Sequence, residues 1–514
     1  MTPGARIGIG APPSSPAGAT PEPGGRPRVP RTDRITTVWL CLALVAGAAS
    51  IGLAGHVPQP LWTMVHVVTL GVLSNGILQW SWYFTRALAR LSPGDPRPGR
   101  RNTARIVAFN LSFLLLVASM WAGSMPGTHL GATGVGLVAA WHGYDLLGAA
   151  RGALASRFAV VMRFYIASAL FLVLAASLSG LVTAGIFSPD APAWIVESHD
   201  GLVLAHAICG LGGWIGLAVG GTLVTLGPTA MRTRMEPDAV ERAVRSLVPW
   251  VAGLLIAATC AALGALPGVG AGLLLVLGAA AYGVVVPLVR AAAAKGPREY
   301  APWSMAAGLV WILVGLLAIA LLALSAADPR SLRALDLPWL PIIGIGGVGQ
   351  LFIGALAYLM PVVIGGGPSV VRLGIARLET WAPARLASRN TALALLAVLA
   401  VPVVRTIPAS PASAGAASVC RLVLLAAFGL DVVLLARSGV AQVRAARQAR
   451  AERGSRGASG ALGTVGVRPS PSSAPNAIPS SGPTGPRAPK PRSSASPPSD
   501  SAPARTPSPE GDPS

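Results

Sequence analysis

The chain has 514 residues, of which 53% are hydrophobic and only 11% are charged. Soluble domains carry about 25% charged residues, so this composition excludes a soluble globular protein and places much of the chain in lipid. The formal net charge is +21. Neither a nucleic-acid-binding motif nor a basic face with interleaved aromatic residues accompanies that charge, so we expect the lipid bilayer, and no nucleic acid, as a partner.

Residues 1–34 are rich in Pro and Gly, carry several arginines and lack an apolar core. They therefore do not have the pattern of a cleavable signal, and we expect a disordered, basic cytoplasmic N-terminus. The first apolar segment that follows is then a retained membrane anchor.

Twelve apolar segments come next, each close to the ~20 residues that cross a bilayer. The predicted fold class is therefore all-α, a polytopic membrane helix bundle of about twelve transmembrane helices within residues 35–437. The predicted spans are 36–55, 61–84, 106–125, 130–150, 164–187, 200–227, 246–266, 269–289, 303–326, 338–364, 390–404 and 416–436.

Basic residues gather in alternate connections between these spans. Because the insertion machinery retains Arg and Lys on the cytoplasmic side, this alternation predicts a plasma-membrane protein with both termini in the cytoplasm. The basic connections are 26–34, 86–105, 151–163, 232–245, 290–298, 372–389 and 437–456, whereas the opposite side has only Arg330, Arg333 and Arg405, together with the acidic residues Asp190, Glu197 and Asp200.

The C-terminal part has two compositions. Arg444, Arg447 and Arg450 recur every three residues, which indicates a short surface helix on anionic lipid in a basic juxtamembrane segment, 438–456. Residues 457–514 consist largely of Pro, Ser, Gly and Ala, so we expect a disordered cytoplasmic tail.

A weak internal repeat connects the sixth and tenth spans. Gly221-Thr-Leu-Val-Thr-Leu-Gly-Pro228 recurs as Gly354-Ala-Leu-Ala-Tyr-Leu-Met-Pro361, four spans later. Four spans earlier, the second span is also rich in glycine and amide residues. This spacing favours three arcs of four helices in which the second, sixth and tenth helices face the interior, although such coincidences are common in this composition.

All six histidines lie within the first 206 residues. His66 and His206 each fall about six residues inside the outer end of a span, roughly 9 Å deep at 1.5 Å per residue. Two neutral imidazoles at one depth are able to ligate a haem iron or, with a third ligand, a copper ion. The alternative is that they hydrogen-bond to neighbouring helices, and that His56, His129 and His199 are ordinary interfacial residues.

His142 lies deeper, in the fourth span, and is a third candidate ligand for a cofactor. Asp145 follows one turn later, where a carboxylate is able to fix the imidazole tautomer or to relay a proton. The alternative for Asp145, and for Asp431 in the last span, is that each side chain reaches the cytoplasmic interface.

Three further features are open to two interpretations. Arg330, Arg333 and Arg421 on the outer side are candidates to neutralise haem propionates or are ordinary solvated charges. Gly365-Gly-Gly-Pro368 is either an anion-binding loop or, as we favour, a helix terminator. The polar and aromatic inner half of the second span is expected to face other helices or a cofactor; its residues are Asn75, Gln79, Trp80, Ser81, Trp82 and Tyr83.

Several of these segments resemble a family of actinobacterial membrane proteins labelled copper oxidase or nitrite-reductase-associated, some of which are fused to cupredoxin domains. The similarity covers about 60–435 and extends distantly to NnrS-type proteins and to subunit I of haem-copper oxidases. It rests on His66-Val-Val-Thr-Leu-Gly71 with Asn75 and Trp80-Ser81, on His206, Gly213-Trp214, the two repeat segments and Arg232-Thr-Arg234, and on Gln350 with Gly365-Gly-Gly-Pro368.

The resemblance implies a haem-copper-oxidase-like bundle with His66 and His206 as metal ligands, and a cupredoxin or copper-containing oxidoreductase as a partner. The chain departs from the family pattern at Tyr83, Ile208 and Gly210, where the resemblance leads one to expect histidine or asparagine. No histidine follows His206, so the tenth span lacks the ligands of an oxygen-reducing oxidase, and we do not expect a terminal oxidase.

The sequence thus leaves three hypotheses. The first is a haem- or copper-binding redox or metal-handling component, and whether it is an enzyme stays open. The second is a transporter in which glycine-rich helices line a path and Asp145 is the ion site. The third is a structural or assembly factor without a cofactor.

Overall fold

The computed structural model describes residues 31–52, 58–153, 156, 158–401 and 411–463. Within these ranges the regular elements are all helices, which confirms the all-α prediction. The chain divides into two compact units, Met1–Ser455 and Arg456–Ser514, and the contacts discussed below belong to the first. His56, most of the predicted N-terminal segment 1–34 and residues 464–514 of the predicted tail lie outside the described residues.

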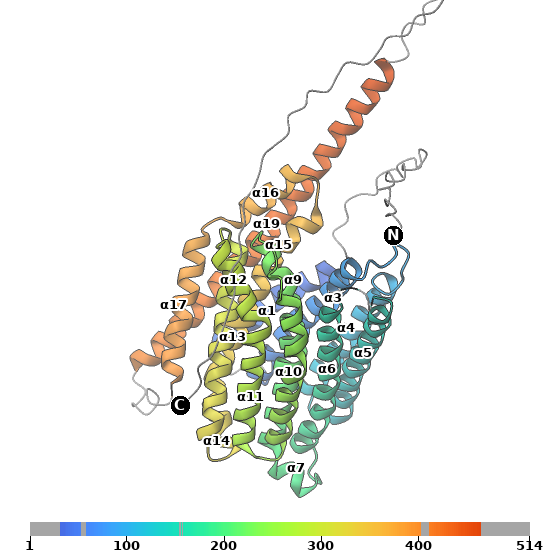
Figure 1. The fold of residues 1–514 in the computed structure, drawn as a ribbon. Helices are drawn as coiled ribbons and strands as arrows, with labels where there is room; N and C mark the ends of the chain where they lie inside the picture. Colours follow the sequence, from blue (N-terminus) through green and yellow to red (C-terminus); the bar gives the residue numbers. More distant parts are fainter. Residues whose placement is uncertain (1–30, 53–57, 154–155, 157, 402–410, 464–514) are drawn as a thin grey trace, which may run out of the picture. The chain divides into compact units, whose positions relative to one another are not determined.

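The helices of the first half are connected mostly by short loops (Figure 1). They are α1 (Arg31–Gly52), α2 (Pro60–His66), η1 (Val67–Ser74), α3 (Asn75–Leu88), α4 (Arg100–Trp121), α5 (Met125–Arg151), α6 (Ala159–Phe187), α7 (Ala193–Glu197), α8 (His199–Ala207), η2 (Ile208–Gly216) and α9 (Leu217–Ala230). The second half comprises α10 (Ala239–Ala262), α11 (Leu266–Ala280), η3 (Ala281–Val285), α12 (Val286–Ala294), α13 (Tyr300–Ser325), α14 (Pro329–Asp336), η4 (Leu337–Trp339), η5 (Ile342–Gly349), α15 (Gln350–Ile364), α16 (Pro368–Leu378), α17 (Ala382–Ala400) and α19 (Pro411–Gly463).

Nine helical segments in the described part of the chain are long and apolar enough to cross a membrane. They run over 60–88, 100–121, 159–187, 199–230, 239–262, 266–294, 300–325, 342–364 and 413–452. The other three predicted spans are also helical, in α1, α5 and α17. However, the apolar part of α1 covers only Ile35–Ala49, and α17 carries Arg385 and Arg389 within its 19 residues.

The predicted second, sixth and tenth spans line the interior. In 60–88, 199–230 and 342–364, 56%, 50% and 50% of the apolar window is buried inside the protein, against 22–44% in the other six segments. Leu73, Trp214 and Val348, one from each, belong to one apolar cluster. The expectation that these three helices face inward is therefore confirmed.

Each of these three segments contains a π-helical stretch, namely η1, η2 and η5, followed by an α-helix. Four residues before each α-helix begins stands a glycine: Gly71, Gly213 and Gly346. A β-carbon there would lie within 2.4–2.7 Å of a side chain on a neighbouring helix, so only glycine permits the close packing. Gly221 and Gly354 of the sequence repeat likewise stand four residues into their α-helices, so the repeat has the same register in the structure.

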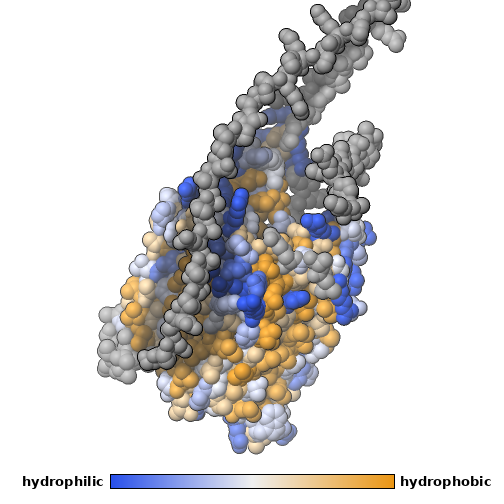
Figure 2. Space-filling view, in the orientation of Figure 1, coloured by the Kyte–Doolittle hydropathy of each residue, from blue (hydrophilic) through white to orange (hydrophobic). Residues whose placement is uncertain are grey.

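The connections 86–105, 232–245, 290–298 and 372–389 lie at one end of the helices, here called the arginine-rich end (Figure 1). Arg232 forms an ion pair with Glu299 at 2.6 Å, and the Tyr300 amide donates to Glu379. These contacts join connections that are distant in sequence. At the opposite end Arg333 pairs with Asp200 at 2.6 Å. Apolar side chains cover the sides of the helices between the two ends (Figure 2).

The C-terminal segment differs from its prediction. Residues 438–456 do not form a separate surface helix, because they continue α19, which runs from Pro411 to Gly463. The helix also extends into the first seven residues of the predicted tail, 457–463. Gly365, Gly366 and Gly367 all have positive φ and end α15 before α16 begins at Pro368, which confirms the helix-terminator interpretation.

The glycine packing predicts the effect of adding one methyl group. In Gly213→Ala the new Cβ would lie 2.4 Å from Cβ of buried Phe171, whose first side-chain atom cannot rotate away, so we expect a loss of about 1–3 kcal/mol in stability. Gly278→Ala, in α11, meets nothing within 4 Å and should keep or raise stability. Melting temperatures of the purified proteins in detergent would test this, and equal values for both variants would contradict the packing.

Candidate metal site and buried polar clusters

His66 and His206 lie next to the π-helical stretches of the second and sixth predicted spans. His66 is the last residue of α2, directly before η1, and His206 stands two residues before η2. The π-helical turns widen the helix and change the direction of the residues around them. The two imidazole ring centroids lie 6.2 Å apart, with an angle of 25° between the ring planes.

The hydrogen bonds of both rings determine their tautomers. His66 Nδ1 lies 2.8 Å from the Trp62 carbonyl oxygen, and His206 Nδ1 lies 2.9 Å from that of Ala175. A carbonyl oxygen only accepts, so each Nδ1 carries the proton and donates it. In the neutral imidazoles each Nε2 then has a free lone pair, which is the state that a metal ligand requires.

Aromatic side chains pack beside the two imidazoles. Metal–imidazole bonds are about 2.0 Å long, so two Nε2 atoms on opposite sides of one ion are about 4 Å apart. The Trp62 ring stacks on His66 with centroids 4.2 Å apart, and the glycines that follow are already covered by Trp39 and Phe171. No group of three or more His, Cys, Asp and Glu side chains among the described residues is arranged to hold a metal.

His142 does not join this pair. It is fully buried in α5, and Ser81 Oγ lies 3.1 Å from its Nε2. Ser81 stands fifteen residues beyond His66, about 22 Å along the helix. The ring also lies edge-on to Trp82 and Trp214. The structure therefore makes His142 a residue of the aromatic core near the arginine-rich end.

Asp145 is buried, with 2% of its side chain exposed, and does not reach the interface. Its two oxygens pair with Arg105, which is fully buried, and with Arg101 at 3.2 Å. The expectation that Asp145 extends to the interface is wrong, because Arg101 and Arg105 form ion pairs with the carboxylate at its buried position. Ser81, and not Asp145, hydrogen-bonds to His142. We call Arg101, Arg105 and Asp145 the Asp145 cluster.

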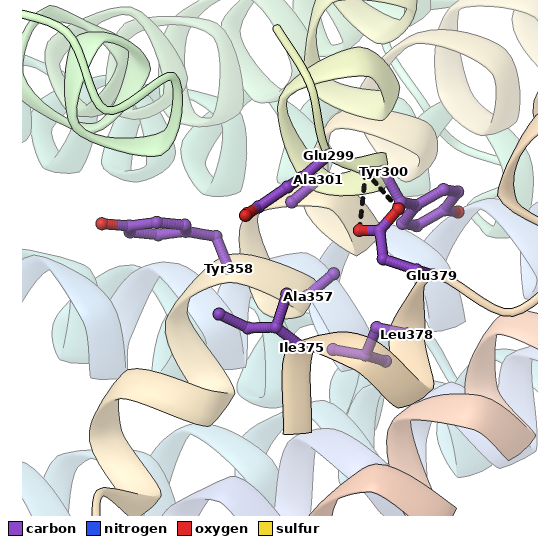
Figure 3. Close-up of a pocket in the computed structure, with 8 residues that line it drawn as sticks. All are labelled: Glu299, Tyr300, Ala301, Ala357, Tyr358, Ile375, Leu378 and Glu379. Atoms are coloured by element: carbon purple, nitrogen blue, oxygen red, sulfur yellow. Dashed lines mark hydrogen bonds between the residues drawn. The ribbon is translucent and has the colours of Figure 1, made fainter. Parts of the chain in front are cut away.

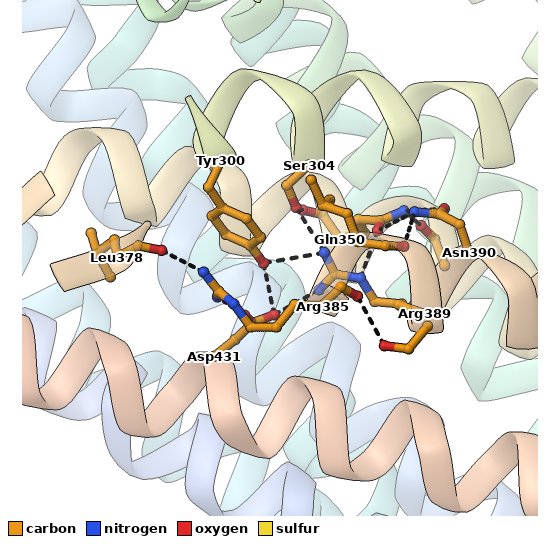
Figure 4. Close-up of polar contacts among 11 residues, drawn as sticks. Tyr300, Ser304, Gln350, Leu378, Arg385, Arg389, Asn390 and Asp431 are labelled. Atoms are coloured by element: carbon orange, nitrogen blue, oxygen red, sulfur yellow. Dashed lines mark hydrogen bonds and ion pairs between the residues drawn. The ribbon is translucent and has the colours of Figure 1, made fainter. Parts of the chain in front are cut away.

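Asp431 is buried in the same way, and the prediction that it reaches the interface is also wrong. It pairs with Arg385, and with Arg389 at 2.6 Å, while the Tyr300 hydroxyl donates to it at 2.9 Å (Figure 4). Arg389 also donates to Gln350 at 2.6 Å. These five residues form the Asp431 cluster, which joins α13, α15, α17 and α19.

The two clusters have matching parts. Arg105 and Arg385 each bind an aspartate on a later helix and a main-chain carbonyl seven or eight residues earlier. An asparagine follows each arginine by five residues, Asn110 and Asn390. Both arginines fall in connections that hydropathy assigns to loops, although the repeated R-x4-N spacing is a signal that they belong to equivalent helices.

Each asparagine pairs with an amide residue that directly follows a π-helical stretch. Asn110 exchanges hydrogen bonds with Asn75 and accepts from Trp39 Nε1 at 2.6 Å. Asn390 does the same with Gln350, and accepts from Trp311 Nε1 at 2.7 Å. Both amides also donate to the carbonyl four residues earlier, Asn75 to Gly71 and Gln350 to Gly346.

The middle part of the chain has a reduced version of this arrangement. Leu217 directly follows η2, where the other two segments have an amide residue. Arg242 lies over the ring of Tyr282, 4.9 Å from its centroid. These two residues are 40 positions apart in the sequence, as are Arg105 and Asp145. The polar set is therefore complete only in the first and third groups of helices.

The remaining candidate residues have ordinary surroundings. His129 Nε2 lies 3.2 Å from the Gly180 carbonyl oxygen, and His199 stands next to the Arg333–Asp200 ion pair. Within the second span, Asn75, Ser81 and Trp82 are buried as expected, whereas Tyr83 is 41% exposed and contradicts the expectation.

A small cavity opens at the arginine-rich end between α13, α15 and α16 (Figure 3). Glu299, Tyr300, Tyr358 and Glu379 are among the residues that line it, and its volume of about 10 Å³ has room for one water molecule. Burial raises the pKa of Glu379. The Glu379 carboxylate accepts a hydrogen bond from the Tyr300 amide at the N-terminus of α13, so its role is helix capping.

These observations define an all-helical, multi-pass membrane protein with two buried arginine–aspartate clusters and one pair of facing histidines. No protein-family model and no curated protein matches the chain.

The Asp145 cluster predicts strongly coupled mutations. Asp145→Leu leaves Arg105 charged and buried without its partner, and we expect a loss of about 3–5 kcal/mol in stability. Arg105→Met with Asp145→Leu removes both charges and should restore most of that loss. Arg245→Gln, which breaks an exposed pair with Glu241, should change stability by less than about 1 kcal/mol. Melting temperatures in detergent measure all three, and additive losses in the double variant would refute a buried pair.

Asp336, on α14 outside the candidate spans, predicts a pH dependence. Burial raises the pKa of its carboxyl group from 3.8 to about 7, while Arg333 lowers it. Below pH 3.8 the carboxyl group is protonated in both the folded and the unfolded state. As the pH rises from 3.8 through 7, the unfolded state loses this proton first, so the free energy of unfolding falls by on the order of 2–4 kcal/mol. Asp336→Asn should therefore raise the melting temperature at pH 8 but not at pH 3.5.

Asp328 provides the matched control on the same helix. Its carboxylate caps α14 and accepts a hydrogen bond from the Ser331 amide, which lowers the pKa of the carboxyl group. Its contribution to folding stability therefore has the opposite pH dependence: it is present above pH 3.8 and is lost as the pH falls below that value. Asp328→Asn should lower the melting temperature at pH 8. Identical pH profiles for the Asp336 variant and the unmodified protein would refute the effect.

Proposed function

We propose that this protein is a plasma-membrane component that binds a transition metal, copper or haem iron, through His66 and His206 and serves in redox chemistry or metal handling. The observation that carries the proposal is the pair of facing imidazoles whose Nδ1 protons are both held by main-chain carbonyls. These two hydrogen bonds fix the tautomer in which both Nε2 atoms are free to bind a metal.

Copper is the better of the two metals for this geometry. Imidazole suits copper, and a bare ion needs no flat cavity between the helices. Trp62, Trp39 and Phe171 occupy the space beside the histidines and the following glycines, where a porphyrin would need room. A bound copper ion supplies one-electron chemistry, while the protein fixes the ligands and excludes water.

The helix arrangement supports a haem-copper-oxidase-like bundle of twelve spans in three arcs. The nine candidate spans become twelve when α1, α5 and α17 are added. Each of these three helices contributes a side chain to the buried polar contacts described above. Trp39 lies on α1, Asp145 on α5, and Arg385 on α17. The matching positions of the two clusters, four helices per arc, favour this count.

The charge distribution supports an orientation with the arginine-rich end in the cytoplasm, and the sequence pattern predicts both termini on that side of the membrane. In that orientation the histidine pair lies near the outer surface. A cupredoxin or another copper-containing oxidoreductase on that side is the partner that fits such a site.

The alternative hypotheses receive less support. A transporter that uses Asp145 as its ion site requires a carboxylate available to a proton or a cation, yet both Asp145 oxygens are held by arginines. An assembly or structural role requires no tautomer control at His66 and His206. The paired histidines therefore favour the metal-binding hypothesis over both.

Metal analysis and optical spectroscopy of the purified protein test the proposal. We expect one copper, or a haem band after dithionite reduction, per chain, and at least a tenfold loss of metal in His66→Ala and in His206→Ala. His129→Ala is the matched control, because that histidine contacts a main-chain carbonyl but not the pair. A folded protein that binds neither metal, or variants that retain it, would refute the proposal and favour an assembly role.

A further inference from the structure

The last helix, α19, presents a row of arginines on its unpacked side. Ser438, Gln442 and Ala446 are buried, and at 100° per residue they share one face of the helix. Arg437, Arg444 and Arg447 are exposed and project from the opposite face. Arg444 and Arg447, which the sequence placed on a separate surface helix, therefore lie along the unpacked face of α19.

The short helix α16 adds two more arginines. Val370, Gly374 and Leu378 form its buried face, while Arg372 and Arg377 are exposed beside Leu373, which is 37% exposed. An exposed leucine between two arginines is typical of a helix that lies in the interface between lipid and water.

Hydrogen bonds fix α16 and α19 at the level where α15 ends. Gln442 donates to the Pro361 and Gly365 carbonyls, at 2.6 and 3.2 Å, and Ser438 donates to the Gly374 carbonyl at 2.8 Å. The candidate span 342–364 ends with α15, so Gln442 stands level with the end of that span. Arg437 and Arg447 stand five residues on either side of it, each within roughly 8 Å along the helix axis.

Acidic residues border this surface: Glu379 directly follows α16 and accepts a hydrogen bond from the Tyr300 amide, Asp431 is paired with Arg385 and Arg389, and Glu452 stands five residues beyond Arg447. Neither α16 nor residues 432–451 of α19 contain Asp or Glu. Elsewhere at this end the acids form ion pairs, as in Arg97 with Asp95 and Arg232 with Glu299. In contrast, five arginines on two rigidly joined helices remain available to a ligand: Arg372, Arg377, Arg437, Arg444 and Arg447.

We propose that these five arginines form a binding surface for the headgroups of anionic phospholipids in the adjacent leaflet. Phosphate groups lie at the level that these side chains reach, and each arginine near such a surface adds to an electrostatic attraction that salt screens. Leu373 lies between them, where an acyl chain would contact it. This proposal does not depend on the metal site, because it rests on the opposite end of the molecule.

Lipid retention by the purified full-length protein tests the proposal. The protein is equilibrated with equal amounts of phosphatidylglycerol and phosphatidylcholine in detergent, and the bound lipids are counted by native mass spectrometry. We expect the unmodified protein to prefer phosphatidylglycerol. The variant with Arg372→Gln, Arg377→Gln, Arg444→Gln and Arg447→Gln should lose at least fivefold of that preference, and 0.5 M salt should weaken it in the unmodified protein.

A matched variant distinguishes this surface from general positive charge. Changing four exposed arginines in other connections of the same end removes an equal charge and should alter the preference by less than twofold; these are Arg86, Arg100, Arg234 and Arg298. An equal loss in both variants, or no loss in the first, would overturn the proposal. Binding of an RNA oligomer that is lost in the first variant without a change in lipid preference would also overturn it, in favour of nucleic acid.

Discussion

A charge inside a membrane bundle has to be neutralised by another side chain, because neither water nor lipid is able to do so. The Asp145 and Asp431 clusters follow from this constraint. Arg105 and Asp145 join α4 to α5, and Arg385, Arg389 and Asp431 join α17 to α19, so the least apolar of the predicted spans are held by ion pairs. Helices that hydropathy alone describes poorly are thereby fixed in the bundle.

The same requirement extends to the main chain of the three central segments. A π-helical turn moves a carbonyl out of its usual helical hydrogen bond, and inside lipid that group needs another donor. Asn75 and Gln350 donate to Gly71 and Gly346, and Ser168 donates to the Trp214 carbonyl in the sixth predicted span. The glycines in these stretches bring neighbouring helices close enough for the amide pairs to form. Packing, irregular helix geometry and polar side chains are therefore interdependent.

The two ends of the protein have different chemistry. At the arginine-rich end, arginines either satisfy the buried aspartates or remain exposed on α16 and α19, where the lipid proposal applies. At the other end, His66 and His206 have both Nδ1 protons satisfied and both Nε2 atoms free, which is the basis of the metal proposal. The rigid central helices connect the two ends, and His142 with its tryptophan neighbours occupies the core between α3, α5 and η2.

The sequence by itself determined the helical class, most of the membrane segments, the alternation of charged connections and the inward position of three helices, because hydropathy and charge act locally along the chain. It also placed His66 and His206 at one depth, since helix rise converts residue number into distance. Only the tertiary structure decided the partners of Asp145 and Asp431, the separation of His142 from the histidine pair and the continuity of α19. Those features depend on which helices become neighbours, and a buried arginine has the same sequence signature as an arginine in a loop until its partner is known.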